Sequence, residues 1–302
     1  MKLAAVVVLF EPEKIGIEKI RSNIESYSDF VDRIFLIDNS LENNAEFFSY
    51  IKKSEYMQNK NKGGIAGAQN MGCSRALEEG YEWVLTMDQD SYFEEVQLQN
   101  YISQVEDIIS KDVSVVSFGP FIKDLNESNY WTVLLRRNVL SPLKKKILGK
   151  RYKSVFDTKV QYVTEVIASG NIVKLEAWNQ IKYDEFLFIE QVDYDFCHNI
   201  IKKGYRLAKL MNVYLDQHFG TRQFALLKKN YPNYGPFRIY YIFRNLWVER
   251  HRFPEYHEKY TDILRKRLFD CCVNTIHPIR NSKIILKAYR DYKEYLKNER
   301  SI

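Results

Sequence analysis

The stretch Trp83-Val84-Leu85-Thr86-Met87-Asp88-Gln89-Asp90-Ser91 decides the fold of this chain. Its first five residues are apolar or β-branched, which predicts a buried strand, and Asp88 stands where that strand ends. Two similar runs come earlier in the chain, Leu3 to Phe10 and Val31 to Ile37. The first third of the chain therefore supplies at least three short buried strands.

Helical segments connect these strands. Lys14 to Tyr27 carries apolar residues at helical spacing, and a second helix is expected at Leu41 to Lys53. A short strand is expected at Tyr56 to Gln58. The glycine-rich segment Asn61 to Asn70 then opens a helix that ends near Glu79. Strands that alternate with helices in this way predict an α/β fold, a parallel sheet with helices on both faces.

The rest of the chain is less regular. Strands are expected at Val113 to Phe118 and Gln161 to Ala168, and Leu187 to Glu190 is strand-like. Residues 126–157, between the first two of these strands, are polar and basic, which favours a loop or flap. Val192 to Lys203 predicts a helix that ends at Gly204, and helices are expected to dominate from Tyr231 onward.

The composition is that of a globular protein. The 302 residues are 45% apolar, enough for one large domain or for an ordinary domain with an appendage. The formal charge of +6 is too small an excess to predict a nucleic-acid partner. Four cysteines without a C-x-x-C pair are typical of a reduced cytosolic protein. The short apolar start predicts neither a signal peptide nor a membrane span, so a cytoplasmic location is expected.

Three polar clusters stand at the carboxyl ends of predicted strands, where open α/β sheets bind ligands. They are Asp38-Asn39, the loop Asn61 to Asn70, and Asp88-Gln89-Asp90. Two carboxylates at a strand end provide oxygen ligands for Mg²⁺ or Mn²⁺, and such a cation would offset the charge of a diphosphate leaving group. The alternative is a surface turn with acidic caps.

Three further features allow a functional and a structural interpretation. The loop Asn61 to Gly67 could approach a phosphate, or could simply start a helix. Asp193 or Asp195 could take a proton from an acceptor hydroxyl, or could cap a helix. His218 could be a nitrogen ligand of a metal held by Asp90, or could be structural.

Taken together, these residues resemble the family 2 nucleotide-sugar glycosyltransferases of the GT-A fold, in particular their bacterial rhamnosyltransferase-like branch. The matching segments follow the order of the family over about residues 3–250 and are Val7 to Pro12, Leu36 to Ser40, Asn61 to Asn70, Asp88 to Ser91, Ser169 to Asn171, Phe188 to Asp195, His218 with Gly220, and Pro236 to Asn245. Glu11 departs from the pattern, because the family more often has Asn there.

The resemblance implies a fold and a division of the chain. The fold is a mixed, mainly parallel sheet flanked by helices, with a C-terminal helical extension. Residues 1–250 would form the GT-A domain, and residues 251–302 the basic, aromatic extension.

The resemblance also implies roles for single residues. The expected nucleotide-binding set is Phe10, Asp38, Asn39, Asn61, Gly64, Asn70, Asp88 and Gln89. Asp90 and His218, with Asp88 as a third ligand, would hold Mn²⁺ or Mg²⁺. Asp193 would be the catalytic base. Three residues are expected on the acceptor side, namely Ser169, Gly170 and Asp195.

The implied activity is a single displacement with inversion at the anomeric carbon. dTDP-L-rhamnose is the donor that the branch favours, while a UDP-hexose or UDP-galactofuranose stays open. The acceptor would be a hydroxyl of a cell-surface glycan or of a lipid-linked glycan. A glycan-binding or nucleotide-sugar-binding protein without activity is the rival from another class, and it would be expected to lose one of the key acidic residues or His218. A nucleotidyltransferase would need a pyrophosphate loop where Phe10 to Glu13 stands.

The C-terminal residues 259–302 interleave Lys and Arg with aromatic and aliphatic residues. A basic amphipathic helix of this kind can lie on an anionic membrane, which would place the protein at the inner face of the plasma membrane. In the alternative, the aromatic stripe packs on the domain itself or on a second subunit, which would make a homodimer.

Overall fold

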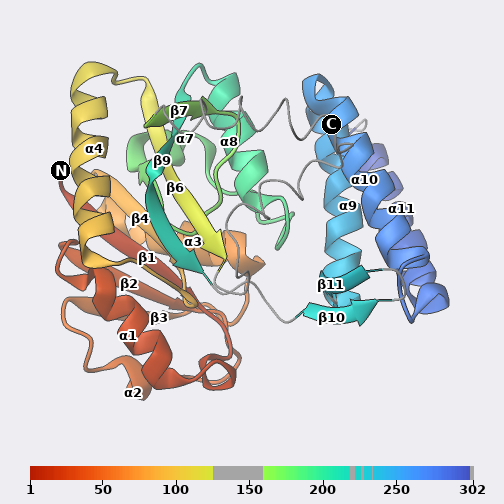
Figure 1. Cartoon of the computed structure of the whole chain (residues 1–302), viewed down its shortest axis with the longest axis horizontal. Helices are drawn as coiled ribbons and strands as arrows, with labels where there is room; N and C mark the ends of the chain where they lie inside the picture. Colours follow the sequence, from red (N-terminus) through yellow and green to blue (C-terminus); the bar gives the residue numbers. More distant parts are fainter. Residues whose placement is uncertain (125–158, 218–221, 226–227, 233, 300–302) are drawn as a thin grey trace. The chain divides into compact units, whose positions relative to one another are not determined.

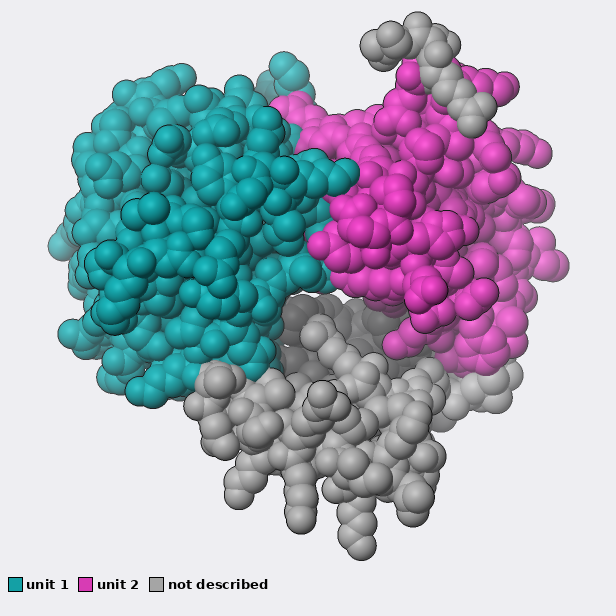
Figure 2. All heavy atoms as spheres, turned by 90° about the horizontal axis from the view of Figure 1, so that it is seen from above, with its two compact units in different colours: residues 1–183, 196–219 teal, residues 184–195, 220–302 magenta. Residues whose placement is uncertain are grey.

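The computed structural model describes residues 1–124, 159–217, 222–225, 228–232 and 234–299. The chain divides into two compact units, coloured separately in Figure 2. Unit 1 is made of residues 1–183 and 196–219, and unit 2 of residues 184–195 and 220–302. The predicted flap at residues 126–157 and the candidate ligand His218 lie outside the described residues.

Unit 1 is built on a mixed sheet whose strand order is β3-β2-β1-β4-β8-β6-β9-β5, with β7 paired to β9 (Figure 1). The first four strands pair in parallel, as predicted, whereas β8 runs antiparallel to both β4 and β6. The strands are β1 (Leu3–Leu9), β2 (Arg33–Asp38), β3 (Ser54–Gln58), β4 (Trp83–Asp88), β5 (Ser91–Tyr92), β6 (Val115–Asp124), β7 (Val160–Val163), β8 (Asn171–Lys174) and β9 (Arg206–Gln217).

Helices cover both faces of this sheet. They are η1 (Pro12–Lys14), α1 (Ile17–Ser28), α2 (Ala45–Phe48), α3 (Gly64–Glu78), α4 (Glu95–Lys111), α7 (Leu175–Ile181) and α8 (Val192–Lys202). All seven residues of β1 are buried, because side chains alternate between faces and each face has its own helices. The helix expected at residues 41–53 is confined to the short α2.

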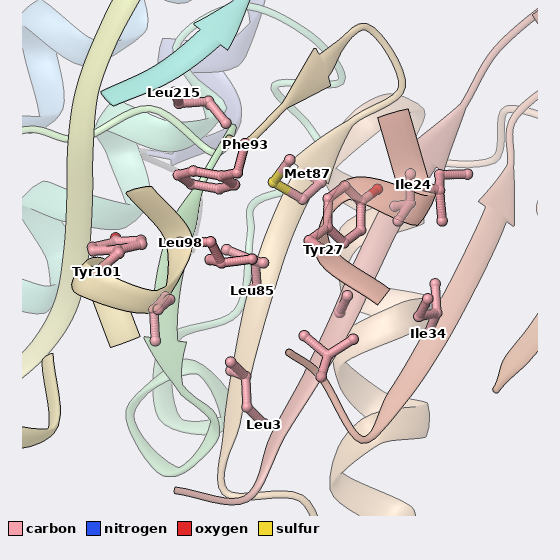
Figure 3. Packing of buried hydrophobic residues seen from close by; sticks show 14 of the residues in the cluster. Leu3, Ile24, Tyr27, Ile34, Leu85, Met87, Phe93, Leu98, Tyr101 and Leu215 are labelled. Atoms are coloured by element: carbon pink, nitrogen blue, oxygen red, sulfur yellow. The ribbon is translucent and has the colours of Figure 1, made fainter. Parts of the chain in front are cut away.

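The largest core cluster lies on the α1 and α4 side of the sheet. Leu85 and Met87 of β4 lie among Tyr27 of α1 and Leu98 and Tyr101 of α4 (Figure 3). On the other face α3 packs tightly against the strands. A Cβ added at Gly72 would stand 2.4 Å from Cγ1 of Val6, so only glycine allows this approach.

Unit 2 contains the helices that the sequence predicted for the C-terminal part. They are α9 (Pro236–Arg252), η2 (Pro254–Tyr256), α10 (His257–Cys272) and α11 (Pro278–Glu299), preceded by the hairpin of β10 (Arg222–Ala225) and β11 (Lys228–Pro232). The three long helices share one core, which includes Phe243, Tyr260 and Ile285. None of the described helices is long and apolar enough to cross a membrane.

Tyrosines of the C-terminal helix contact aromatic rings elsewhere in unit 2. The rings of Tyr289 and Trp247 have centroids 5.1 Å apart, and Tyr295 stacks on Phe186 at 5.1 Å. The predicted domain boundary after residue 250 lies inside α9. By packing, α9 belongs with α10 and α11, and a functional division at residue 250 stays a prediction.

The segment before α8 is the clearest difference from the sequence-based expectation. Leu187 to Glu190 is strand-like in sequence, but it forms turns and bends. Phe188, Glu190 and Gln191 have positive φ of 65°, 64° and 67°, which no strand allows. Side chains from α9, and not a neighbouring strand, bind the carbonyl groups of this segment.

A cluster of buried ionisable groups joins α8 to α9 within unit 2. Asp195 accepts a hydrogen bond of 3.0 Å from Arg252, which also pairs with Asp184 at 2.7 Å. Glu249 is completely buried beside Asp195. Burial, and then the charge of Asp195, raise the pKa of Glu249 well above the usual range of a glutamate. Glu249 therefore releases its proton at a higher pH than an exposed glutamate does.

We predict that Glu249→Gln flattens the dependence of stability on pH. The raised pKa means that folded Glu249 keeps a proton which the unfolded chain releases as the pH rises through 4.5. Its contribution is thus full below that pH and is lost as the pH rises toward the folded pKa. Gln cannot titrate and keeps the shape, so the stability of the variant relative to wild type should rise as the pH increases above 4.5.

Urea unfolding at a series of pH values measures this difference, with Glu258→Gln, an exposed position of α10, as the matched control. If Glu249→Gln followed the same pH dependence as the wild type and the control, Glu249 would not carry a proton that unfolding releases.

Candidate active site

The ends of three parallel strands bring the predicted donor residues together in unit 1. In the sheet register, Leu9 of β1 pairs with Asp38 of β2, and Val8 pairs with Asp88 of β4. Asp38 and Asp88 therefore lie on either side of the end of β1, where Phe10 follows. This is the edge at which α/β sheets bind ligands, and the predicted convergence is present.

Gln89 ties the end of β4 to the end of β1. Its Oε1 accepts a hydrogen bond of 3.0 Å from the N–H of Phe10, and its Nε2 donates one of 2.8 Å to the carbonyl of Phe10. Asn23 of α1 donates to the carbonyl of Gln89 at 2.9 Å. The amide of Gln89 is thus used to fix the backbone, while the Phe10 ring is 47% exposed and faces outward from this corner.

Asp38 is completely buried, and both of its oxygens accept hydrogen bonds from the protein. Oδ1 accepts from the N–H of Ser40, and Oδ2 accepts from Asn44 Nδ2 and from Tyr56 Oη, each at 2.7 Å. Burial and the bond to Asp38 raise the pKa of Tyr56 above its usual range, so this phenol stays a donor. Asp38 shapes the strand end, and its contact with a nucleotide base stays a prediction.

Asn39 and Asn59 build the glycine-rich loop in front of α3. Asn39 Nδ2 donates to the carbonyl of Gly64 at 3.0 Å, and Asn59 Nδ2 donates to Asn39 Oδ1 at 2.6 Å. Within this loop Asn61, Gly63 and Gly64 have positive φ. Gly63 is the N-cap residue of α3, and Gly64 is its first residue. The loop is thus held by buried amides and not by its glycines alone.

Asn70, expected to line the nucleotide, is engaged inside unit 1. Its Oδ1 accepts from the N–H of Tyr183 at 2.9 Å and from Trp178 Nε1 at 3.3 Å, and its Nδ2 donates to the carbonyl of Tyr183 at 2.9 Å. This amide joins α3 to the segment after α7. A contact between Asn70 and a nucleotide stays a prediction.

Asp88 and Asp90 are both partly exposed at the end of β4. Asp88 Oδ2 accepts a hydrogen bond of 3.2 Å from Gln217 Nε2, and Ser91 Oγ lies 3.4 Å from Asp90 Oδ1. β5 pairs with β9 so that Ser91 stands opposite Gln217. Gln217 is the residue before His218, so β9 runs to this corner, although His218 itself is outside the described residues.

Among the described residues no three His, Cys, Asp or Glu side chains gather as a ready metal site. The Oε1 atom of Gln217 is nevertheless buried and has no hydrogen-bond partner in the described part of the chain. The carboxylates of Asp88 and Asp90 at the end of β4 are hard oxygen donors, which suit Mg²⁺ or Mn²⁺ shared with substrate phosphates.

Ser169 and Gly170 lie directly beneath this corner. Ser169 is buried and donates to Ser91 Oγ at 2.7 Å, and the N–H of Gly170 donates to the carbonyl of Thr86 at 2.8 Å. Gly170 has φ of 78°, and a Cβ there would stand 2.8 Å from Pro120. β7 ends at Val163, five residues before the expected end at Ala168. The role of Ser169 and Gly170 on the acceptor side stays a prediction.

Asp193 and Asp195 belong to unit 2 and stand in the first turn of α8. Asp193 is half-buried, whereas Asp195 lies in the core and pairs with Arg252. The roles of Asp193 as base and of Asp195 on the acceptor side stay predictions, and the geometry of Asp195 is that of a structural ion pair.

Several residues that shape these sites were assigned no role from the sequence. Gln217, Asn59 and Ser91 hold the strand-end corner, and Arg244 and Asn245 hold the segment before Asp193. Their position was a signal. Gln217 ends β9, Asn59 follows β3, Ser91 begins β5, and Arg244 and Asn245 close a recognised segment. Their partners are far away in sequence, which a local pattern does not reveal.

Comparison with known proteins agrees with this architecture. Residues 16–170 match the family model described as "Glycosyl transferase family 2", which is slightly more than half of the chain. Over 248 residues the chain is 25% identical to the dTDP-rhamnosyl transferase RfbF of Shigella flexneri, covering 81% of this chain and 78% of that protein.

Solved structures share the fold at low sequence identity. The structure of S. aureus TarS residues 1–349 in complex with UDP-GlcNAc has a TM-score of 0.57 and 16% identity, covering 97% of this chain and 80% of that one. The structure of GalNAc-T7 with UDP, GalNAc and Mn²⁺ also has a TM-score of 0.57, with 14% identity over 89% of this chain. This chain spans only 54%, about half, of GalNAc-T7. The expected GT-A fold is confirmed, and the chain belongs to glycosyl transferase family 2 and resembles its rhamnosyltransferases.

Proposed function

We propose that this protein is an inverting, metal-dependent glycosyltransferase that moves L-rhamnose from dTDP-L-rhamnose to a hydroxyl of a cell-surface or lipid-linked glycan. The observation that carries the proposal is the register of β1 with β2 and β4, which brings Phe10, Asp38 and the Asp88–Asp90 pair to one sheet edge in a chain of this family. The rhamnosyl donor is supported by the similarity to RfbF.

The donor site needs a cation, and the residues at the end of β4 fit one. Asp90 would be the main ligand, with His218 and Asp88, and Gln217 donates a hydrogen bond of 3.2 Å to Asp88 at the same corner. A bound Mn²⁺ or Mg²⁺ would neutralise the diphosphate as it leaves. The outward-facing Phe10 ring would pack on the nucleotide base, as aromatic faces do with planar rings.

The proton of the acceptor hydroxyl would pass to the carboxylate of Asp193. The hydroxyl oxygen then forms a bond to the anomeric carbon while the bond from that carbon to the diphosphate oxygen breaks on the opposite face. One carboxylate is enough for this displacement, unlike a retaining reaction, which uses a second carboxylate as a nucleophile. Strained backbone conformations cluster at functional sites, and Phe188, Glu190 and Gln191 just before Asp193 have such conformations.

A lipid-linked acceptor would bring the protein to a membrane, and one face of α11 suits an anionic bilayer. Five cations recur at helical spacing on its exposed side: Arg280, Lys283, Lys287, Arg290 and Lys293. None of them forms an ion pair with any described residue. Ile279, just before Arg280, and Leu286, between Lys283 and Lys287, are 73% and 57% exposed. Apolar side chains favour a bilayer over a purely polar partner. A homodimer through the same face is the alternative that the test below separates.

The first prediction concerns the donor. dTDP-L-rhamnose with Mn²⁺ should raise the melting temperature, since a ligand that binds only the folded state stabilises it by about 2.7 kcal/mol at a hundred times its Kd. UDP-glucose, UDP-GlcNAc and UDP-galactofuranose serve as the competing donors. Asp90→Asn should abolish the part of the shift that needs metal, while Asp107→Asn, an exposed position of α4, should keep it.

A larger shift with a UDP-sugar would replace the proposed donor by that sugar. No shift with any member of the panel would contradict a nucleotide-sugar site altogether. A shift without any transfer to a panel of octyl glycosides and lipid-linked glycans would favour the non-catalytic binding protein.

The second prediction concerns the base. Asp193→Asn keeps the size of the side chain but cannot accept the proton, so transfer should fall by about 10²-fold or more while the donor-induced thermal shift survives. The measurement is release of dTDP from dTDP-L-rhamnose in the presence of the acceptor panel. Asp262→Asn, an exposed position of α10, is the matched control. Transfer close to the wild-type rate in Asp193→Asn would exclude Asp193 as the base.

The third prediction concerns the membrane. Replacing Lys283, Lys287 and Lys293 together by Gln should weaken binding to vesicles of anionic phosphatidylglycerol by at least about tenfold, because each Lys near such a surface contributes about 1 kcal/mol. Because α10 and α11 supply core residues, substitution tests this surface better than deletion does.

The charge-matched control replaces three exposed lysines of unit 1, Lys19, Lys52 and Lys203, and should leave vesicle binding nearly unchanged. Absence of binding by the wild type, or equal loss in both triple variants, would contradict the membrane surface. A dimer in solution that the α11 variant dissolves would assign the face to a second copy.

A further inference from the structure

Residues 186–191, which we call the approach segment, lead directly into α8 and have a costly backbone conformation. Phe188, Glu190 and Gln191 are all left-handed, with φ between 64° and 67°. For residues other than glycine this conformation costs roughly 1 kcal/mol or more each. None of the three is Asn or Asp, which tolerate it best, so the surrounding structure must stabilise the segment.

Asn245 of α9 provides the main support. Its side chain is completely buried, and Nδ2 lies 2.9, 2.7 and 2.8 Å from the carbonyl oxygens of Leu187, Ile189 and Glu190. An amide has only two N–H groups, so the three carbonyls share them. Three carbonyls that no strand or helix satisfies thus converge on one nitrogen, which fixes their directions.

Arg244, the preceding residue, extends this support. Its Nη2 donates to the carbonyl of Phe186 and, at 3.1 Å, to that of Leu187. The guanidinium carbon also lies 4.3 Å from the ring centroid of Phe186 and 4.7 Å from that of Tyr241. These cation–π contacts keep the charge of Arg244 compensated although its side chain is almost fully buried.

The side chains of the approach segment also bind the same face of α9. Phe188 stacks on Tyr241 with centroids 5.2 Å apart and an angle of 18° between the rings. Glu190 forms an ion pair with Arg238. The contacting residues of α9 thus recur at helical spacing, so that one rigid helix determines both the backbone and the side chains of the segment.

The conformation of the approach segment determines the position of the first turn of α8. The carbonyl of Gln191 accepts a hydrogen bond of 2.9 Å from the N–H of Asp195, and this bond closes the first turn of the helix. Asp193 lies within this turn, two residues after Gln191. A shift of the left-handed residues would therefore rotate or displace the carboxylate of Asp193.

We propose that Asn245 and Arg244 are positioning residues, which hold the approach segment in its left-handed conformation and so aim the carboxylate of Asp193 at the acceptor hydroxyl. This inference rests on the proposed role of Asp193 as the base. A positioning role differs from simple core packing in one respect, because its loss misplaces a reacting group in a protein that is still folded.

The test uses Asn245→Ala in the full-length protein, and two readouts separate positioning from stability. Deuterium uptake of peptides covering residues 186–195 should rise selectively, because the three carbonyls lose their common donor. The kcat for dTDP release with acceptor should fall about 10- to 100-fold with little change in the KM for dTDP-L-rhamnose, as expected when a catalytic group is displaced by about 1 Å.

Asn281→Ala is the matched control. Asn281 is also a buried asparagine of unit 2, and its Nδ2 donates to the carbonyl of Cys271 at 2.9 Å, away from the approach segment. It should lower the melting temperature by a similar amount and leave both kcat and the deuterium uptake of residues 186–195 unchanged.

A second substitution tests whether the lost kcat comes from the backbone conformation. The Gln191 side chain has a buried oxygen without a hydrogen-bond partner among the described residues, so Gln191→Gly removes little and lets a left-handed φ form without cost. In the Asn245→Ala background it should recover at least about threefold of the lost kcat, if the loss comes from the backbone conformation.

The inference is overturned if Asn245→Ala leaves kcat unchanged, as Asn281→Ala should, or lowers it only in proportion to the fraction unfolded. Failure of the base assignment gives a different result. If Asp193→Asn retained transfer while Asn245→Ala still loosened residues 186–195, Asn245 would hold the segment but not aim Asp193.

Discussion

The parallel pairing of β1 with β2 on one side and β4 on the other is the constraint on which the rest of this structure depends. β1 is apolar throughout and buried on both faces, so it can only lie in the middle of a sheet that helices cover on both sides. Its register places Leu9 beside Asp38 and Val8 beside Asp88. The polar residues that the strands cannot accommodate are thereby collected at one edge, and a site for a charged ligand forms there.

Most polar groups at that edge satisfy one another. Asp38, Asn39 and Asn70 each bind other parts of unit 1, and Gln89 is paired with the backbone of Phe10. A buried polar group without a partner costs free energy, so residues that form the frame of a site must themselves be hydrogen-bonded. The groups that stay accessible are the Phe10 ring and the carboxylates of the Asp88–Asp90 pair. Within a recognised motif, frame residues and ligand-binding residues therefore have different physical roles.

Prediction from sequence succeeded where the structure depends on neighbouring residues and failed where it depends on distant hydrogen-bond partners. The buried strands and α3 were predictable because their apolar residues follow the period of the element that they form. The segment at Leu187 to Glu190 was taken for a strand because its residues are apolar and extended conformations suit them. Its left-handed backbone depends on Asn245, more than fifty residues later, and a window of neighbouring residues contains no trace of that partner. The buried ion pair of Asp195 with Arg252 also joins residues that are far apart in sequence, so no local pattern reveals it, while the place of Asp195 on the acceptor side stays a prediction.

The sequence by itself determined the α/β class, the family, the polar strand ends and the helical character of the C-terminal part, because these follow from local periodicity and from short ordered motifs. The tertiary structure decided which of the polar residues are frame and which stay accessible, since hydrogen-bond partners such as Gln89 with Phe10 are brought together only by the sheet. It also decided the conformation that leads to Asp193, because a left-handed backbone is stable there only when a buried amide from a distant helix binds its carbonyls.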